Sequence, residues 1–503
     1  MGSRTDEWRG PVADLAPRLE ARDDLAVREV EVHADAGSRT FHASDGPFAH
    51  YERRVRWSRD RDDLVVVQHV EWHLAFPYWR WLYRPMIGRL VANGLGPDDR
   101  PWWLFPDRLS PRQARTVATM ALFSLVAGLL YGQLTQVLTF ASADIGDGSS
   151  GEQALIFALV RIGAVLTAFV MIQADRFGRR RVAVWAFGIA IATSLMTAVV
   201  PGLPALTVLQ AVSRNMAVAG LLAVDTISVE ELPAGSRAMA AGLGAMAYGL
   251  GAGIAVLALP LADLTPWGWR LVFALSVITL PMVISGARHL GESARFRLLA
   301  SGPSGATPHR IHGGRFLLLA ALFLLVNVFV APVSQLQNDY LRADRGFSGM
   351  TITIFTVLTG TPAAVGVIVG GRLADRRGRR LALVPGLLAL GVFTAIFFWV
   401  AGPAMWLSAL VAGVLGALTV APLGVLAPEL FPTARRGGAR GALNVLAVTG
   451  SVSGLVLAGA GVDAFGYGPT FVLLALGPLI AAALAFAVPE TGGRELEDIN
   501  PEE

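Results

Sequence analysis

Long hydrophobic runs separated by short polar loops fill the chain after residue 112. A helix of about 17 to 25 such residues crosses the hydrocarbon core of a bilayer. The pattern therefore predicts twelve transmembrane helices, which we place at residues 117–140, 154–173, 182–200, 205–228, 238–261, 269–285, 316–333, 350–369, 381–400, 404–426, 442–460 and 470–488.

Arginine is unevenly divided between the two sets of loops. The loops that follow the even-numbered runs, including the middle loop, carry 18 arginines, and the opposite side carries three, of which Arg270 lies at the start of the sixth run. Because arginine-rich loops stay on the cytoplasmic side, both chain termini are predicted to be cytoplasmic. The first long hydrophobic run begins past residue 115, so we expect no secretory signal.

Two sequence signatures occur twice. The loop QADRFGRRR at residues 173–181 returns as LADRRGRR at residues 373–380. A second signature, Glu-x-x-Pro-x-x-x-Arg, starts at Glu230 and starts again 199 residues later at Glu429. Two signatures with nearly the same offset indicate duplication of a six-helix unit, as in many secondary carriers.

Composition favours a membrane protein over an enzyme or a nucleic-acid binder. Hydrophobic residues make up 53% of the chain and charged residues only 16%. The chain has no cysteine and shows no nucleophile, metal-ligand or phosphate-loop pattern, so we predict no enzyme activity, no cofactor and no metal site. Its arginines lie mostly in loops, where membrane topology explains them better than nucleic-acid binding.

Residues 1–112 have a different character and hold seven of the twelve Trp residues. From Leu64 to Phe76, hydrophobic and polar residues alternate with the period of a half-buried strand, and residues 50–57 precede it across a charged turn, which predicts a hairpin. Residues 77–90 mix arginine with Trp and Tyr, which suits a lipid headgroup layer. This cytoplasmic region is therefore either a small α+β domain or a membrane-interface module.

The motifs of the remaining chain resemble the major facilitator superfamily, most closely its sugar-porter and metabolite:proton symporter branches. The resemblance covers residues 113–503 and is carried by Gly371-x-x-x-Asp375-Arg376-x-Gly378-Arg379-Arg380, by ELFPTARRGGARG after the tenth run, by GESAR after the sixth and by PETGG after the last. It implies an all-α membrane protein with two pseudo-symmetric six-helix bundles, residues 113–288 and 316–488, a cytoplasmic linker, 289–315, and a cytoplasmic tail, 489–503. It also implies a small-molecule substrate, a co-transported proton and a monomer in the lipid bilayer.

The repeated loops predict a cytoplasmic latch. Asp175 and Asp375 can each meet the positive end of a neighbouring helix, while arginines pair with nearby carboxylates. Such pairs would hold the outward-facing state and break on inward opening; the alternative is that the arginines only set topology. The first copy has Met171 in place of the motif's glycine, which leaves its helix packing open. The latch candidates are Asp175, Arg176, Gly178, Arg179, Arg180, Glu230, Arg237, Glu292, Gly371, Asp375, Arg376, Gly378, Arg379, Arg380, Glu429, Arg436 and Glu490.

Polar residues inside the hydrophobic runs are candidates for the substrate site, because ionisable groups in a bilayer are costly and usually functional. Gln210, Arg214 and Asp225 are spaced to share one face of the fourth helix. Arg214 would bind a substrate carboxylate or pair with an acid, and Asp225 would join this site or the latch. In the resembled family, helices one, four, seven and ten line the cavity, which adds the amides Gln133, Gln136, Gln335 and Asn338; hydrogen bonding between helices is the alternative for these amides.

An outer gate is a further hypothesis. Arg161 lies about 10 Å inside the outer end of the second helix, at 1.5 Å per residue. Asp463 ends the eleventh helix, which neighbours the second in the resembled fold. The two side chains would then form an extracellular ion pair.

The sequence therefore predicts secondary active transport of a small organic solute across the cytoplasmic membrane by alternating access. The solute would be a sugar, polyol or organic acid, and proton coupling follows from the resemblance. Residues 131–134 lack the first-helix aspartate of proton-coupled importers, and residues 242–255 lack the Gly-Pro element of drug antiporters. The alternatives are export of a metabolite and a non-transporting sensor or adaptor that uses residues 1–112.

Overall fold

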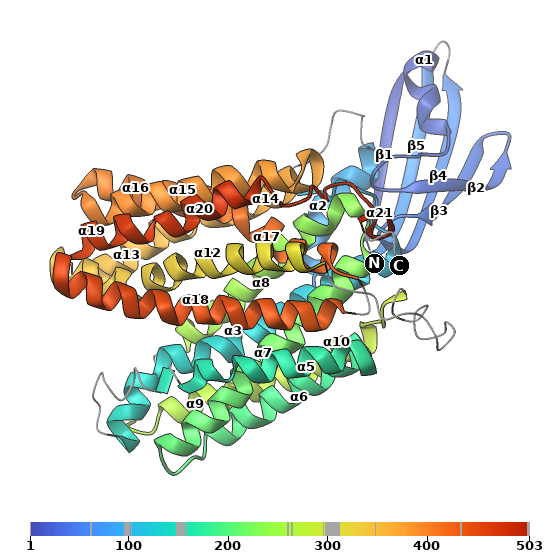
Figure 1. Ribbon diagram of the computed structural model, residues 1–503. Helices are drawn as coiled ribbons and strands as arrows, with labels where there is room; N and C mark the ends of the chain where they lie inside the picture. The colour runs from blue at the N-terminus through green and yellow to red at the C-terminus, as the bar shows by residue number, and fades with distance from the viewer. Residues whose placement is uncertain are drawn as a thin grey trace. The chain divides into compact units, whose positions relative to one another are not determined.

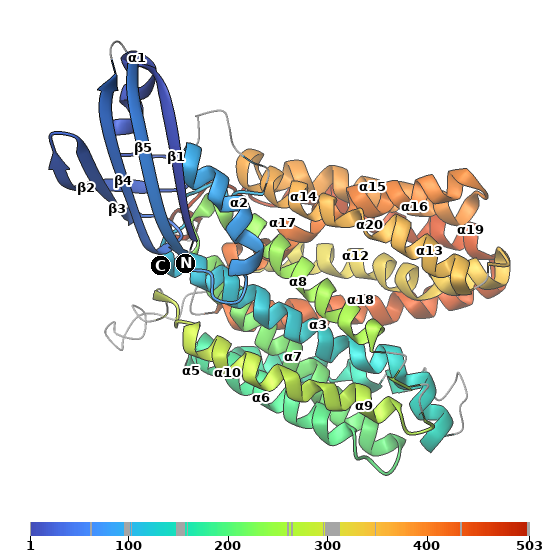
Figure 2. The same ribbon diagram turned by 180° about the vertical axis from the view of Figure 1, so that it is seen from behind.

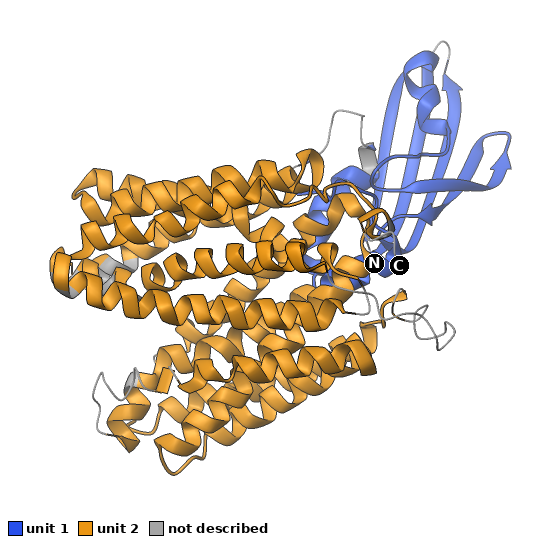
Figure 3. Cartoon of the chain, viewed as in Figure 1, with its two compact units in different colours: residues 1–119 blue, residues 120–503 orange. Residues whose placement is uncertain are grey.

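The computed structural model describes residues 2–60, 63–94, 101, 103–146, 156–157, 159–258, 261–262, 265–294, 296, 312–347, 349–432 and 435–499. The chain divides into two compact units, residues 1–119 and residues 120–503 (Figure 3). The boundary expected from the sequence lies near residue 112.

Unit 1, residues 1–119, is built on a five-stranded antiparallel sheet with the order β1-β5-β4-β3-β2 (Figure 1). The predicted hairpin is confirmed, since β4 and β5 pair along their length and Asp60 lies opposite Asp63. Short helices connect β1 to β2, and one longer helix follows β5. The elements are β1 (Gly2–Pro11), α1 (Val12–Leu15), η1 (Ala16–Leu19), β2 (Arg28–Asp35), β3 (Ser38–Asp45), β4 (Phe48–Asp60), β5 (Asp63–Leu74) and α2 (Arg80–Asn93).

The stretch predicted to suit lipid headgroups forms α2, which has two different faces. Ile87 and Val91 are buried in a core that includes Trp72 and Phe76. On the opposite face the Trp81 side chain is 73% exposed. The helix thus contributes to an aromatic core and also presents an aromatic side chain to the surroundings.

A buried ion pair fastens the sheet of unit 1. The Arg53 guanidinium, 1% exposed, donates from Nη2 to Glu29 Oε2 at 2.6 Å. The Tyr51 hydroxyl donates to the other oxygen of the same carboxylate at 2.6 Å. Burial and the neighbouring Glu29 carboxylate raise the pKa of Tyr51 well above its usual range. Because each charge has close partners, the network is stable only while all its members are present.

Unit 2, residues 120–503, is helical, and its helices group into two bundles (Figures 1 and 2). The first bundle contains α3 (Pro111–Ile145, most of which lies in this unit), α5 (Ala164–Phe177), α6 (Arg179–Thr197), α7 (Leu203–Glu231), α8 (Arg237–Leu257), α9 (Trp269–Ala274) and α10 (Thr279–His289). The second contains α12 (Gly313–Asp339), α13 (Gly349–Gly360), α14 (Ala363–Arg377), α15 (Arg379–Trp399), α16 (Pro403–Gly416), α17 (Val420–Leu430), α18 (Arg436–Phe465), α19 (Tyr467–Leu474) and α20 (Leu476–Ala485), and the short α21 (Leu496–Ile499) follows.

Ten helical segments in the described part of the chain are long and apolar enough to cross a membrane. They coincide with ten of the twelve predicted runs. The other two runs, 154–173 and 182–200, overlap with α5 and α6. The α6 helix starts with three consecutive arginines, and residues 151–155 and 158 lie outside the described part.

The duplication extends to helix packing. A Cβ atom added to Gly251 on α8 would lie 1.9 Å from the Leu125 carbonyl oxygen on α3. A Cβ added to Gly450 on α18 would lie 2.5 Å from the Leu324 carbonyl oxygen on α12. Both residues of the second pair follow those of the first by 199 positions. Glycine thus allows equivalent backbone contacts in the two bundles, as is common between membrane helices.

Candidate functional site

A buried arginine in the middle of α7 has an aromatic and hydroxyl environment. The Arg214 side chain is 6% exposed, and its guanidinium carbon lies 3.8 Å from the centroid of the Tyr131 ring. Its Nη2 donates to Thr135 Oγ1 at 3.1 Å, whereas its Nε finds no acceptor among the described residues. Tyr131 and Thr135 both come from α3, which therefore positions the arginine by a cation–π contact and one hydrogen bond.

A second arginine adds positive charge to this place. Arg161 is half-buried and interacts electrostatically with Tyr131 and with Arg214. The ring of Tyr248, on α8, lies 6.2 Å from that of Tyr131. Among the described side chains, neither arginine has a carboxylate partner. Two buried or half-buried cations that have no carboxylate among their described neighbours favour the binding of an anion there. We call these four residues and Thr135 the arginine pocket.

The other polar residues predicted on α3 and α7 contact neighbouring helices. Gln133 is fully buried, donates to the Val272 carbonyl at 2.7 Å and accepts from Ser194 Oγ at 2.8 Å. Gln210 donates to Thr197 Oγ1 at 2.9 Å. These contacts match the alternative of hydrogen bonding between helices.

The remaining amide candidates have fewer described contacts. Gln136 is half-buried on α3. Gln335 and Asn338 lie on α12, but their side chains are outside the described part. Their neighbour Gln337 lines a cavity of about 250 Å³ in the second bundle together with Thr356, Thr359 and Thr394.

The repeated loops build two matching charge clusters. In the first cluster, the Asp175 carboxylate at the end of α5 accepts the Gly437 and Gly438 N–H groups at 3.0 and 2.8 Å. These N–H groups start α18 in the other bundle, where a helix has no internal acceptors for them. Arg179 lies 3.3 Å from Asp175 and 3.7 Å from Glu230, and Arg436 pairs with the same Glu230.

The second charge cluster repeats this arrangement with the bundles exchanged. Asp375, on α14, accepts the Ala238 and Met239 N–H groups at the start of α8, at 3.0 and 2.8 Å. Arg379 pairs with Asp375 and donates to Glu429 Oε1 at 2.7 Å. Arg237 lies 3.8 Å from Glu429. In both clusters an aspartate of one bundle caps a helix of the other.

Glu292 and Glu490 cap the helices that begin inside these clusters. Glu292 accepts the N–H groups of Arg179 and Arg180 at 3.2 and 3.1 Å, and Glu490 accepts those of Arg379 and Arg380 at 2.7 and 3.2 Å. The preceding residues, Gly178 and Gly378, have φ angles of +97° and +108°, which favour glycine. A Cβ at either would lie within 2.7 Å of the capping carboxylate.

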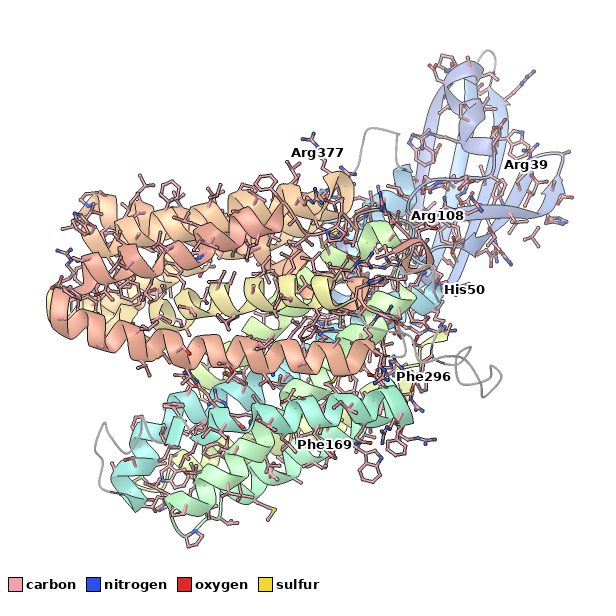
Figure 4. The ribbon with its side chains drawn as sticks, in the orientation of Figure 1. Arg39, His50, Arg108, Phe169, Phe296 and Arg377 are labelled. Atoms are coloured by element: carbon pink, nitrogen blue, oxygen red, sulfur yellow. The ribbon has the colours of Figure 1, made fainter. Side chains whose placement is uncertain are left out.

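The outer members of the motif are exposed. Arg176 and Arg376 are exposed, as is Arg377, whose side chain points away from the helices (Figure 4). Phe296, labelled in the same view, lies under the Arg179 guanidinium at 4.6 Å. Within each motif, Arg179 or Arg379 is thus buried in a charge cluster, whereas Arg176, Arg376 and Arg377 are exposed.

The packing question raised by Met171 has a structural answer. In the second copy, Gly371 faces α8, and an added Cβ would lie 2.9 Å from the Met239 Cα atom. In the first copy Met171 is fully buried, and glycine occurs instead on the partner helix, where a Cβ at Gly437 would lie 2.7 Å from the Met171 carbonyl oxygen. In the first copy the glycine lies on α18, the partner helix, and not on α5. Both helix pairs can therefore approach closely.

Asp225 pairs with Arg440, one of the 18 arginines in the loops that follow the even-numbered runs. Asp225 Oδ2 lies 2.9 Å from Arg440 Nη2, which connects α7 to α18. Gln210, Arg214 and Asp225 thus point to three different helices, α6, α3 and α18. Arg440 lies one turn after Arg436 on α18, and this spacing could have indicated that Arg440 faces the first bundle. No sequence pattern indicated Tyr131 and Tyr248, because their contact joins residues far apart in the chain.

The outer gate stays a prediction. Arg161 is described, but the Asp463 side chain lies outside the described part. Among the described residues, no group of three or more His, Asp or Glu side chains is arranged to hold a metal ion.

Comparison with known proteins agrees with this architecture. The family model described as Major Facilitator Superfamily matches residues 316–501. A cis,cis-muconate transport protein of Acinetobacter baylyi is 28% identical over 54% of this chain and 69% of its own length. A sialic acid transporter of Escherichia coli is 24% identical over 76% of this chain and 96% of its own length.

Solved structures share the fold. A proton:xylose symporter has a TM-score of 0.68 at 16% identity, covering 77% of this chain and 98% of the symporter chain. A human organic anion transporter has a TM-score of 0.61 at 15% identity, covering 74% of this chain and 99% of its own. The chain is a transporter and not an enzyme. The Major Facilitator Superfamily model matches its second bundle, residues 316–501, and solved transporters of 15–18% identity share the fold of the helical part.

Proposed function

We propose that this protein is a secondary active transporter that carries a small organic anion, a carboxylate, through twelve membrane spans by alternating access. Both termini and the two charge clusters lie on the cytoplasmic side of the plasma membrane in this proposal, in keeping with the arginine count of the loops. The single observation that carries the substrate class is the arginine pocket, where Arg214 and Arg161 have no described carboxylate partner.

An anion fits this pocket for electrostatic reasons. An arginine fork recognises a carboxylate through charge-assisted hydrogen bonds, which are stronger in a site shielded from water. The tyrosine rings of Tyr131 and Tyr248 add apolar surface and hydroxyl groups beside the charge. A neutral sugar would leave both cations unpaired at a cost. The names of two relatives, a muconate transport protein and a sialic acid transporter, are consistent with this preference.

The charge clusters are the proposed latch. Each joins an aspartate of one bundle to a helix N-terminus of the other, so both must break when the bundles separate on the cytoplasmic side. Their intact contacts correspond to a state closed to the cytoplasm. In this state the arginine pocket would receive substrate from outside.

Counterflow of radiolabelled solutes in proteoliposomes tests the proposal. The panel contains muconate, sialic acid and xylose, and the variants are Arg214→Ala and, as a matched control, Arg181→Ala, whose side chain is exposed. We expect carboxylate counterflow in the wild type and the control. Arg214→Ala should weaken it about 10- to 100-fold, because a hydrogen bond to a charged group contributes about 1.5–3 kcal/mol. Xylose counterflow without carboxylate counterflow would refute the anion assignment.

A further inference from the structure

One ion pair between the bundles has no counterpart in the duplicated architecture. Asp225 on α7 and Arg440 on α18 lie 2.9 Å apart, and Arg440 also donates toward the Leu222 carbonyl and Thr226 Oγ1 of α7 at 3.3 and 3.4 Å. Arg440 is 8% exposed. Every bond of this group joins the first bundle to the second.

The positions equivalent to Asp225 and Arg440 in the sequence duplication form the same helix contact without charged side chains. The residues 199 positions away are Gly424, after Asp225, and Ala241, before Arg440. A Cβ added to Gly424 would lie 3.4 Å from the Ala241 Cβ, an ordinary van der Waals contact. Since the second crossing packs without charge, closing the bundles does not require the pair. The ion pair is present in only one of the two equivalent helix contacts. It therefore points to a role other than holding the bundles together.

Along α7 the pair lies between the arginine pocket and Glu230 of the first charge cluster. Asp225 follows Arg214 by eleven residues, about 16 Å along the helix axis. Residues 211, 218, 221, 222 and 225 are partly exposed positions on this side of α7, and the Asp225 side chain keeps 28% of its surface accessible. Arg440 is the charged group that faces Asp225. The other charged groups near it on α7 and on the helices packed against α7, Asp175, Arg179, Glu230, Arg237, Glu429 and Arg436, are engaged in the charge clusters.

We propose that Asp225 is the proton-coupling residue of this carrier and that Arg440 is its switch partner; this inference rests on the proposed transport function. A proton from the external water binds the Asp225 carboxylate and breaks the ion pair, which allows α7 and α18 to separate. A carboxyl group without its cation in apolar surroundings is stable only in the neutral form. In the inward-open state the proton leaves to the cytoplasmic water, and the restored carboxylate pairs again with Arg440.

The test compares two transport modes in proteoliposomes, with the solute that shows counterflow in the wild type. Counterflow at equal pH needs only alternating access, whereas accumulation driven by an inside-alkaline gradient needs proton transfer. The variants are Asp225→Asn, which keeps the side-chain shape, and Arg440→Gln, with monodispersity in detergent as the folding check. A trapped pH dye records proton entry on addition of solute.

We expect Asp225→Asn to lose accumulation and proton entry at least tenfold while counterflow changes less than threefold. Arg440→Gln should keep proton-driven accumulation, because the carboxyl group that carries the proton is still present. Equal loss or equal retention of accumulation in both variants would overturn the proposal, and so would loss of counterflow in a monodisperse Asp225→Asn protein. Wild-type counterflow without gradient-driven accumulation would also overturn it, whereas no wild-type counterflow of any carboxylate would instead refute the proposed function.

Discussion

Single glycines control how closely the two bundles approach at the charge clusters. Gly437 and Gly438 both donate N–H groups to Asp175, but their Cα atoms have different surroundings. A Cβ at Gly437 would lie 2.7 Å from both the Asp175 Oδ1 atom and the Met171 carbonyl oxygen. A Cβ at Gly438 would lie no closer than 3.5 Å to any neighbour. The same methyl group is therefore forbidden at one position and tolerated at the next.

This difference gives a prediction with an adjacent control. Gly437→Ala should push α18 away from α5, weaken the capping bonds of Asp175 and lower the rate of counterflow severalfold. Gly438→Ala should transport like the wild type. The measurement is initial counterflow rate together with the melting temperature in detergent, where overpacking of this kind typically costs about 1–3 kcal/mol. Equal behaviour of the two variants would show that α5 and α18 are not in close contact when the carrier works.

At the scale of elements, helix starts are held by carboxylates that lie far away in the sequence. Glu490 follows α20 and accepts the first N–H groups of α15, more than one hundred positions earlier. Burial alone would raise the pKa of Glu490, but the N–H groups of Arg379, Gly492 and Arg380 and the Arg379 charge outweigh it and lower the pKa. A carboxyl with a lowered pKa stabilises the fold at neutral pH, and this contribution is lost as the pH falls through the folded-state pKa.

We therefore expect acid to destabilise the start of α15 through Glu490. Between about pH 6 and pH 3 the melting temperature of the wild type should fall more steeply than that of Glu490→Gln, because the variant has no charge to lose. At pH 7 the variant should be less stable by about 1 kcal/mol, the usual contribution of an anion at a helix N-terminus. Parallel pH curves for the two proteins would contradict the assignment.

At the scale of the whole molecule, the charge clusters and the arginine pocket belong entirely to unit 2. Their described residues run from Tyr131 to Glu490. The α3 helix has its own start signal, a capping box in which the Ser110 N–H donates to Gln113 Oε1 and the Gln113 N–H donates to Ser110 Oγ. Unit 2 together with residues 106–119 therefore contains what transport requires in this proposal.

Deletion of residues 2–105 should consequently preserve transport. We expect carboxylate counterflow with an unchanged KM, because no residue of the arginine pocket is removed and α3 keeps its cap. The measurement is the concentration dependence of counterflow, with the Arg214→Ala protein as the inactive reference. Complete loss of counterflow in a monodisperse truncated protein would assign unit 1 a direct part in the cycle.

Much of the architecture was readable from the sequence because membranes impose simple rules. The hydrocarbon core demands long apolar helices, so the twelve runs predicted the helical part, and ten of them meet the length and composition of a span. Alternation of buried and exposed residues likewise predicted β5 and its hairpin with β4. The repeated motifs predicted that Asp175 and Asp375 would lie near helix starts, and the contacts at Gly437 and Ala238 agree with this.

Only the tertiary structure decided which polar residues meet. Arg214 lies beside Tyr131, Gln210 turns to Thr197 and Asp225 meets Arg440, although all three were placed on one helix face. Helical periodicity defines a direction around one axis, but partners depend on the rotation and distance of several helices that are far apart in the chain. For the same reason no local pattern could show that glycine had moved from one side of the first cluster to the other, or that the Asp225 pair lacks a counterpart in the second.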